Sequence, residues 1–176
     1  MNKLLCGLRC NQAMKRLSEG DKSSLTVLYD CMADQMYALA FSILKNPADA
    51  EDAMQETFLK VLQHIDTYRE NGNARAWLLS ITRNVSIDIL RSRKNTLSMD
   101  DPEMEEQAGE MPDVVERLEI GDALAALSEA DRQIVVLKAV SGMNFGEIAQ
   151  IVELPVTTVQ KRYQRARKKL MSHLQR

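Results

Sequence analysis

The sequence predicts an all-α protein made of two small helical bundles joined by a flexible acidic linker, with a helix-turn-helix in the second bundle. Three observations support this fold class. Glycine and proline are scarce, with 7 and 4 in 176 residues, and aromatic residues make up only 5%. Apolar residues recur every three to four positions along most of the chain, which is the spacing of one helix face. An acidic stretch interrupts this pattern in the middle.

The length of the chain and its charge distribution further limit its possible domain organisation. A chain of 176 residues with 45% hydrophobic content can hold one large or two small cores. We expect bundles at residues 1–94 and 113–176, with the linker at 95–112. The net charge of −2 is an average over a chain whose positive and negative residues are separated. Acidic residues crowd the middle, and the C-terminus is uniformly basic. A positive surface is therefore expected near the C-terminus despite the acidic average.

The first bundle is predicted to begin with several consecutive helices. Residues 1–17 have a weak helical pattern. Ser23 or Ser24 can cap a helix that runs to about Leu44, because serine is favoured at the N-cap. The dipeptide at 46–47, Asn-Pro, then marks the start of another helix, since proline is favoured at the first helical position.

A polar loop precedes the last helix of this bundle. Residues 66–73 have no apolar periodicity, and Asn71-Gly72 is a turn signal. We expect Asn73 to cap a long helix that ends near Arg93. Trp77 lies on the apolar stripe of that helix, so it is expected in the core.

The second bundle follows the acidic, proline-containing segment at 95–112. Val114 to Leu127 carry a further helical pattern. Ser128 with Asp131 forms a capping box for the next helix, which is expected to stop at Gly142.

The stretch from Asn144 to Leu174 indicates a helix, a turn and a basic helix. Asn144 and Glu147 supply an N-cap and its reciprocal partner, and Pro155 ends the first helix. Glu153 occupies the turn where glycine is usual, so the turn is made either without positive φ or with mild strain. One apolar stripe follows the second helix: Val159, Tyr163, Ala166, Leu170 and Leu174.

Such a basic helix suits DNA, because an α-helix fits the major groove and flanking cations contact phosphates. The candidate DNA contacts on the predicted second helix are Thr157, Thr158, Gln160, Lys161, Arg162 and Arg165. The alternative is a solvated cationic face on an ordinary C-terminal helix. The preceding helix and turn favour DNA binding.

Three cysteines, Cys6, Cys10 and Cys31, are an odd number without a CxxC motif, which favours a reducing cytoplasm over a disulfide scaffold. Cys6 and Cys10 stand one helical turn apart and could ligate a metal with Cys31 or His64. We expect small apolar packing residues instead, because a closed tetrahedral site needs four placed ligands. No metal or cofactor is predicted.

Neither a signal peptide nor a membrane span is expected, because polar residues interrupt the apolar start of the chain. An enzyme is disfavoured too. His64 and His173 are isolated, and the sequence has no glycine-rich phosphate loop or metal-ligand spacing. No small-molecule substrate is therefore predicted.

Two stretches resemble a known family. Residues 46–94, NPADAEDAMQETFLKVLQHIDTYRENGNARAWLLSITRNVSIDILRSRK, resemble the second region of an extracytoplasmic-function (ECF) sigma factor. Residues 127–170, LSEADRQIVVLKAVSGMNFGEIAQIVELPVTTVQKRYQRARKKL, resemble the fourth region. The resemblance runs from about Leu25 to Leu174, so the N-terminal extension with its first two cysteines lies outside it. Many relatives read Gly-Ile-Pro-Val-Gly-Thr-Val where this chain reads ELPVTTV.

The resemblance implies a bacterial promoter-specificity subunit that binds core RNA polymerase and promoter DNA and is controlled by an anti-sigma factor. It implies that the basic helix reads the −35 element. It implies docking on the core enzyme through the polar face of one helix: Asp49, Asp52, Gln55 and Glu56. It implies that the loop and the start of the following helix bind a flipped base of the −10 element, through Tyr68, Asn71, Asn73 and Arg75. A solvated face remains the alternative for the carboxylates.

A free-standing helix-turn-helix regulator with an N-terminal sensing or dimerisation bundle is the second hypothesis. Such a regulator has no need of a polar loop like residues 68–73 beside a basic helix. The loop therefore favours the sigma-factor interpretation.

Overall fold

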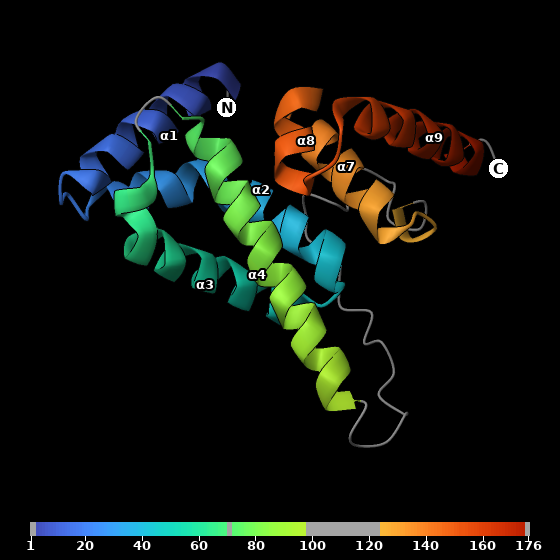
Figure 1. Cartoon of the computed structure of the whole chain (residues 1–176), viewed down its shortest axis with the longest axis horizontal. Helices are drawn as coiled ribbons and strands as arrows, with labels where there is room; N and C mark the ends of the chain where they lie inside the picture. The colour runs from blue at the N-terminus through green and yellow to red at the C-terminus, as the bar shows by residue number, and fades with distance from the viewer. Residues whose placement is uncertain (1–2, 70–71, 98–123, 175–176) are drawn as a thin grey trace.

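A computed structural model describes residues 3–69, 72–97 and 124–174, and all regular structure in these ranges is helical, which confirms the all-α prediction (Figure 1). The N-terminal helices are α1 (Lys3–Ser18), α2 (Ser24–Leu44), α3 (Pro47–His64), the short 3₁₀-helix η1 (Ile65–Thr67) and α4 (Ala74–Leu97). The C-terminal helices are α7 (Glu129–Ala139), α8 (Phe145–Val152) and α9 (Val156–Leu174).

Several helix starts follow from local chemistry. The Asn46 side chain accepts a hydrogen bond from the Asp49 N–H at 3.1 Å, with Pro47 at the first helical position of α3. The Asn73 side chain accepts from the Ala76 N–H at 3.2 Å at the start of α4. Both caps confirm the sequence prediction.

Two helix ends differ from the prediction. Ser23 precedes α2 without capping it, because its backbone is already helical and its hydroxyl donates to the Asp21 carboxylate at 2.5 Å. Helix α4 continues past Arg93 to Leu97, since residues 94–97 include no helix breaker. The first three residues of the predicted linker are therefore helical, and its remainder, residues 98–112, lies outside the described residues.

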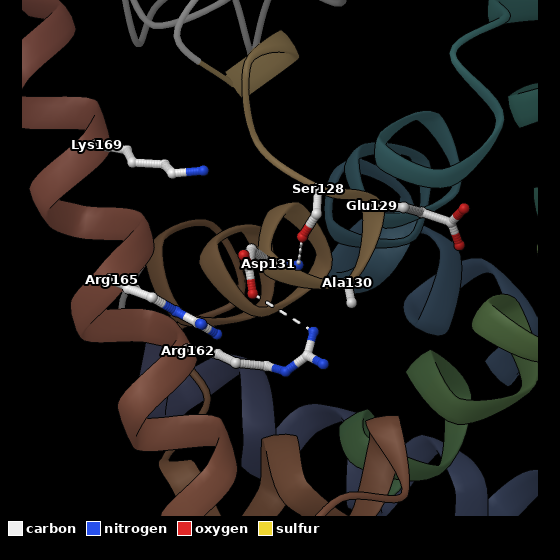
Figure 2. A pocket seen from close by; sticks show the side chains of 7 residues that line it. All are labelled: Ser128, Glu129, Ala130, Asp131, Arg162, Arg165 and Lys169. Carbon is white, nitrogen blue, oxygen red and sulfur yellow. Dashed lines mark hydrogen bonds and ion pairs between the residues drawn. The ribbon is translucent and has the colours of Figure 1, made fainter.

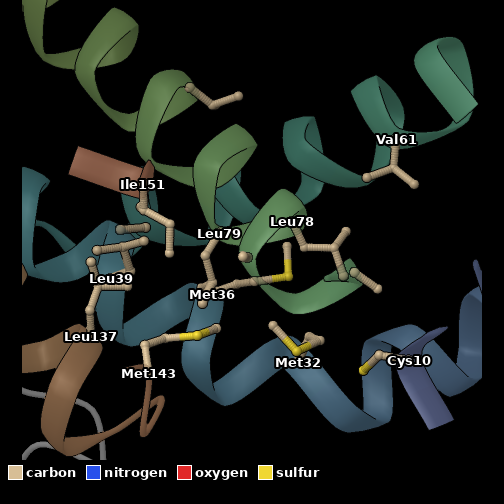
Figure 3. Close-up of a cluster of buried hydrophobic side chains, with 14 of the residues drawn as sticks. Cys10, Met32, Met36, Leu39, Val61, Leu78, Leu79, Leu137, Met143 and Ile151 are labelled. Atoms are coloured by element: carbon tan, nitrogen blue, oxygen red, sulfur yellow. The ribbon is translucent and has the colours of Figure 1, made fainter. Parts of the chain in front are cut away.

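Helix α2 is the centre of the core. Its methionine and leucine side chains Met32, Met36 and Leu39 are fully buried, and α1, α3, α4 and α7 all pack against the helix. Figure 3 shows α2 side chains in one cluster with Leu78 and Leu79 from α4. A helix covered on several faces must be apolar around most of its circumference, as the sequence of α2 is.

The same cluster continues into the second bundle. Leu137 of α7, Met143 of the loop that follows α7, and Ile151 of α8 are buried with the α2 and α4 side chains (Figure 3). A smaller cluster, Leu124, Leu127, Val135 and Ala166, packs α7 against α9. The two bundles therefore share apolar surface in this structure.

Buried polar contacts accompany this shared surface. Arg132 of α7 is 7% exposed and donates to three carbonyl oxygens, those of Leu124 at 3.0 Å, Leu127 at 2.9 Å and Ser42 at 2.9 Å. The Ser42 contact joins α7 to the end of α2. Arg83 of α4 donates to the Gln133 side chain at 2.9 Å. Hydrogen bonds to a charged donor contribute more than neutral ones, so these contacts help to hold the two bundles together.

Candidate nucleic-acid and polymerase interfaces

Helices α8 and α9 form the predicted helix-turn-helix. The Glu147 N–H donates to the Asn144 side chain at 2.9 Å, and the Asn144 N–H donates to the Glu147 carboxylate at 2.7 Å. This reciprocal capping box confirms the predicted start of α8. Glu153 ends α8 in the left-handed conformation, with φ 56 and ψ 44. The turn is therefore made with the mild strain that a residue bearing a Cβ has in this region.

The apolar stripe of α9 faces the bundle. Val159 and Ala166 are fully buried, and the Tyr163 ring lies edge-on to Phe145 of α8 at 5.5 Å. Leu170 is partly buried against the smaller cluster. The side chain of Leu174 lies outside the described residues. This packing holds α9 by one face and leaves its cationic face outward.

The residues predicted to contact DNA differ in how exposed they are. Thr157, Gln160, Lys161 and Arg165 are exposed, whereas Thr158 and Arg162 are partly buried. Arg162 Nη1 lies 3.5 Å from Asp131 Oδ1, which makes no hydrogen bond and is held by this ion pair. Arg162 therefore has a structural partner that the sequence did not indicate.

An open pocket of about 600 Å³ lies between α9 and the N-terminus of α7 (Figure 2). The side chains of Arg162, Arg165 and Lys169 extend from α9 toward the first turn of α7, where Ser128 caps the helix. The predicted capping box at Ser128 is half formed: the Ser128 hydroxyl accepts from the Asp131 N–H at 3.3 Å, while the Asp131 carboxylate pairs with Arg162. The partial positive charge of a helix N-terminus adds to these cations.

The loop before α4 is built around two aromatic rings. Tyr68 is buried and its ring lies 5.5 Å from the ring of Trp77, tilted by 60°. The Tyr68 hydroxyl donates to the Gly72 carbonyl at 3.3 Å. Trp77 is only partly buried and packs on the core, as expected. Asn71 lies outside the described residues.

Asn73 and Arg75 contact the second bundle. The Asn73 amide nitrogen donates to Glu147 Oε1, the carboxylate oxygen that does not take part in the capping box of α8. Arg75 donates to the Ser141 carbonyl oxygen and, at 2.9 Å, to the Gln35 side chain. The structure thus brings two of the candidate −10 residues against the loop and helix that precede α9.

The outer face of α3 is partly apolar. Asp52, Gln55 and Glu56 are exposed, while Asp49 is partly covered by Arg93 of α4, whose Nη1 lies 2.5 Å from Asp49 Oδ2. Leu59 lies on the same exposed face and is 54% exposed.

The helical spacing of Met54, Phe58, Val61, Leu62 and Ile65 predicts that these residues point inward from one helix. Leu62 of α3 is instead 38% exposed, because Val61 already fills the inward position and the next residue is rotated by about 100° around the helix. The sequence pattern did not single out Leu59, and it assigned Leu62 to the core because leucine at helical spacing is ordinarily buried.

These features define a class of protein: an all-helical chain whose second bundle presents a cationic helix-turn-helix and whose first bundle presents a polar loop and a mixed helix face. Residues 28–96 match the family described as Sigma-70 region 2, and residues 117–170 match the family described as Sigma-70, region 4.

Individual relatives agree with these matches. The chain is 31% identical over 150 residues to the RNA polymerase sigma factor SigV of Bacillus subtilis (strain 168), covering 84% of this chain and 90% of the relative. It is 33% identical over 157 residues to the ECF RNA polymerase sigma factor SigL of Mycobacterium tuberculosis (strain H37Rv), covering 86% and 89%. The protein belongs to the ECF sigma factors of the sigma-70 family.

Solved structures support the same fold. CnrH in complex with the cytosolic domain of CnrY superimposes with a TM-score of 0.73 at 23% identity, covering 95% of this chain and 97% of that chain, and shows the likeness of fold. The sigma factor RpoE in complex with the anti-sigma factor NepR from Bartonella quintana gives a TM-score of 0.69 at 27% identity, covering 80% and 89%.

As a member of this family the protein is an alternative sigma factor, which binds core RNA polymerase and directs promoter-specific initiation of transcription. None of the helices within residues 3–69, 72–97 and 124–174 has the length and apolar character needed to cross a membrane.

The left-handed residue of the turn gives a stability prediction. Glu153→Gly should raise the free energy of unfolding by roughly 0.5–1 kcal/mol, because glycine adopts φ 56 without a Cβ clash. Urea denaturation measures the change. Glu153→Ala is the matched control, since it removes the same charge and keeps the strain. An equal gain in both variants would assign the effect to charge.

Proposed function

We propose that residues 1–94 bind core polymerase and open the −10 element, and that residues 113–176 read the −35 element, with residues 95–112 as the tether. In this proposal the protein has no catalytic activity of its own and acts in the cytoplasm, where its cysteines, all free in the described structure, stay reduced. Tyr68, Asn71, Asn73 and Arg75 hold the unstacked base. Asp49, Asp52, Gln55 and Glu56, together with Leu59, contact the core enzyme.

The contacts of Asn73 and Arg75 carry this proposal. Each side chain donates a hydrogen bond to an oxygen atom of the second bundle, a carboxylate in one case and a carbonyl in the other. Base edges and phosphates offer the same kind of acceptor. Both side chains are therefore oriented to donate to an acceptor at the bundle surface.

The same contacts imply competition. While Asn73 and Arg75 hydrogen-bond the second bundle, their donors are not available to DNA. Core polymerase would have to separate the bundles before each one reached its promoter element. An anti-sigma factor, as in the RpoE complex with NepR, would act in the opposite direction by keeping the surfaces covered.

For −35 recognition we assign separate tasks to the cations of α9. Lys161, exposed near the start of the helix, is placed to reach a base edge, together with Thr157 and Gln160. Arg165 and Lys169 flank the N-terminus of α7, where a backbone phosphate would be stabilised by the helix dipole and the two cations. Thr158 and Arg162 complete the contact surface, with Arg162 oriented by Asp131.

These assignments predict two different phenotypes. Lys161→Ala should cost about 1–3 kcal/mol for the preferred −35 duplex and relax specificity at one base pair. Arg165→Ala should weaken all sequences alike and lower the salt slope by about 1. Fluorescence anisotropy with holoenzyme measures both. Lys22→Ala, which removes an exposed cation from the first bundle, is the control. Unchanged selectivity and salt slope in both variants would remove α9 from the reading role.

The α3 face gives a prediction for core binding. Leu59→Ala and Glu56→Ala should each weaken the affinity for core polymerase about tenfold, because a few side chains near the centre of an interface carry most of its binding energy. Both residues are exposed, so stability should change little. Asp88→Ala removes an exposed carboxylate from α4 and serves as the charge-matched control. Core affinity equal to wild type in both α3 variants would exclude this face.

Promoter opening tests the proposed function as a whole. Permanganate reactivity of −10 thymines should appear only with core enzyme and this protein together, because base extrusion costs a few kcal/mol that the bundle must offset. Asn73→Ser should reduce the reactivity strongly, since serine keeps the helix cap but removes the amide donor. Core binding should remain unchanged in this variant. Tight site-specific binding by the protein alone, without polymerase-dependent opening, would identify a free-standing regulator instead.

A further inference from the structure

The three cysteines, which have no part in the proposed function, converge in the interface between α1 and α2. Cys6 and Cys10 lie one turn apart on α1, and Cys31 faces them from α2. Their sulfur atoms all lie within 4.8 Å of one another. All three side chains are buried, with exposures of 4%, 0% and 6%. His64, the other ligand considered from the sequence, is exposed and is not part of this group.

The surroundings of Cys10 and Cys31 favour their protonated forms. Burial raises the pKa of Cys10 and of Cys31. Cys6 and Cys31 raise the pKa of Cys10 further, and Cys6 raises that of Cys31. The Cys6 thiol donates to the Cys31 carbonyl oxygen at 3.3 Å, and the Gln35 amide donates to the same oxygen at 3.0 Å. As thiols, the three side chains pack as small apolar residues do. As thiolates, they would need a cation among them.

We infer that Cys6, Cys10 and Cys31 form a three-thiolate site for a soft, three-coordinate ion such as Cu(I) or As(III). For Cu(I) in a trigonal plane, metal–sulfur bonds of about 2.3 Å place the sulfur atoms about 4.0 Å apart. As(III) is pyramidal because of its lone pair and brings the sulfur atoms closer together, so both arrangements are compatible with the 4.8 Å limit after little movement. Thiolate ligands select soft ions. Zn²⁺ fits less well, because it takes four ligands and the described residues supply no fourth histidine, cysteine or carboxylate to this group.

The chemistry balances without any redox step. With Cu(I), three S–H bonds break, three Cu–S bonds form and three protons leave. With arsenous acid, three As–S bonds replace three As–O bonds, and the thiol protons leave with the hydroxyl groups as three water molecules. The second product is electrically neutral, which suits a buried site that disfavours net charge.

The position of α1 makes such binding relevant to the rest of the bundle. The Asn11 side chain of α1 accepts a hydrogen bond from the Ala74 N–H at 3.0 Å, at the start of α4. An ion that crosslinks α1 to α2 would therefore also stabilise the hydrogen bond between Asn11 and the N-terminus of α4. Occupancy should raise the melting temperature of the full-length protein, since the ion binds only the folded arrangement of the ligands.

The test is anaerobic titration of the reduced full-length protein with Cu(I), supplied from a chromophoric chelator, and separately with arsenite and Zn²⁺. Native mass spectrometry counts the bound ions. We expect one Cu(I) or one As(III) per chain, bound more tightly than Zn²⁺, with a raised melting temperature. Cys10→Ser should weaken binding by at least about 100-fold, because even the loss of an outer hydrogen bond at a metal site costs 10–100-fold.

Ala13→Ser is the matched control, because it also places a hydroxyl in a buried position of α1 and leaves the three thiols intact. It should bind as the wild type does. Cys31→Ser repeats the test from α2 should Cys10→Ser fold poorly. Failure of the wild-type protein to bind either soft ion stoichiometrically would overturn the inference, as would tighter binding of Zn²⁺ or equal binding by the cysteine variants.

Discussion

The burial of α2 is the constraint on which the rest of the structure depends. A helix whose Met32, Met36 and Leu39 are fully buried must be covered from several sides at once. Helices α1, α3 and α4 cover part of it, and α7 covers a further part. The apolar surface that completes the first bundle is thus supplied by the second. Non-directional burial of this kind tolerates exchange of one apolar cover for another, which is the property that a protein with alternative partners needs.

Hydrogen bonds between the two bundles add directional interactions to this apolar packing. Arg132 ties α7 to the end of α2 through the Ser42 carbonyl, and Arg75 ties α4 to the Ser141 carbonyl. Asn73 reaches the carboxylate that caps α8. Each of these donors bonds an acceptor that a different surface could also supply. The second bundle therefore contacts the start of α4, which is assigned to the −10 element in the proposed function, through interactions that DNA could replace.

The outward surfaces are separated by chemical type. The free face of α9 is cationic, and its cations meet the positive end of α7 at the pocket of Figure 2. The free face of α3 combines carboxylates with Leu59 and Leu62. Two positively charged faces of this kind repel each other, whereas a polyanion is attracted along the whole helix. The apolar component of α3 favours a protein partner instead.

Local chemistry was enough to predict much of this protein. The caps at Asn46, Asn73 and Asn144 and the apolar stripe of α9 depend on residues within one or two helical turns, so the sequence by itself determined the helices, the helix-turn-helix and the family. Contacts between residues far apart in the chain depend on how the helices pack. Only the tertiary structure could therefore decide the pairing of Asn73 with Glu147, the ion pair that occupies Arg162 and the exposure of Leu59. The convergence of Cys31 on Cys6 and Cys10 has the same origin, since the spacing of one helical turn on α1 says nothing about which residue of α2 faces it.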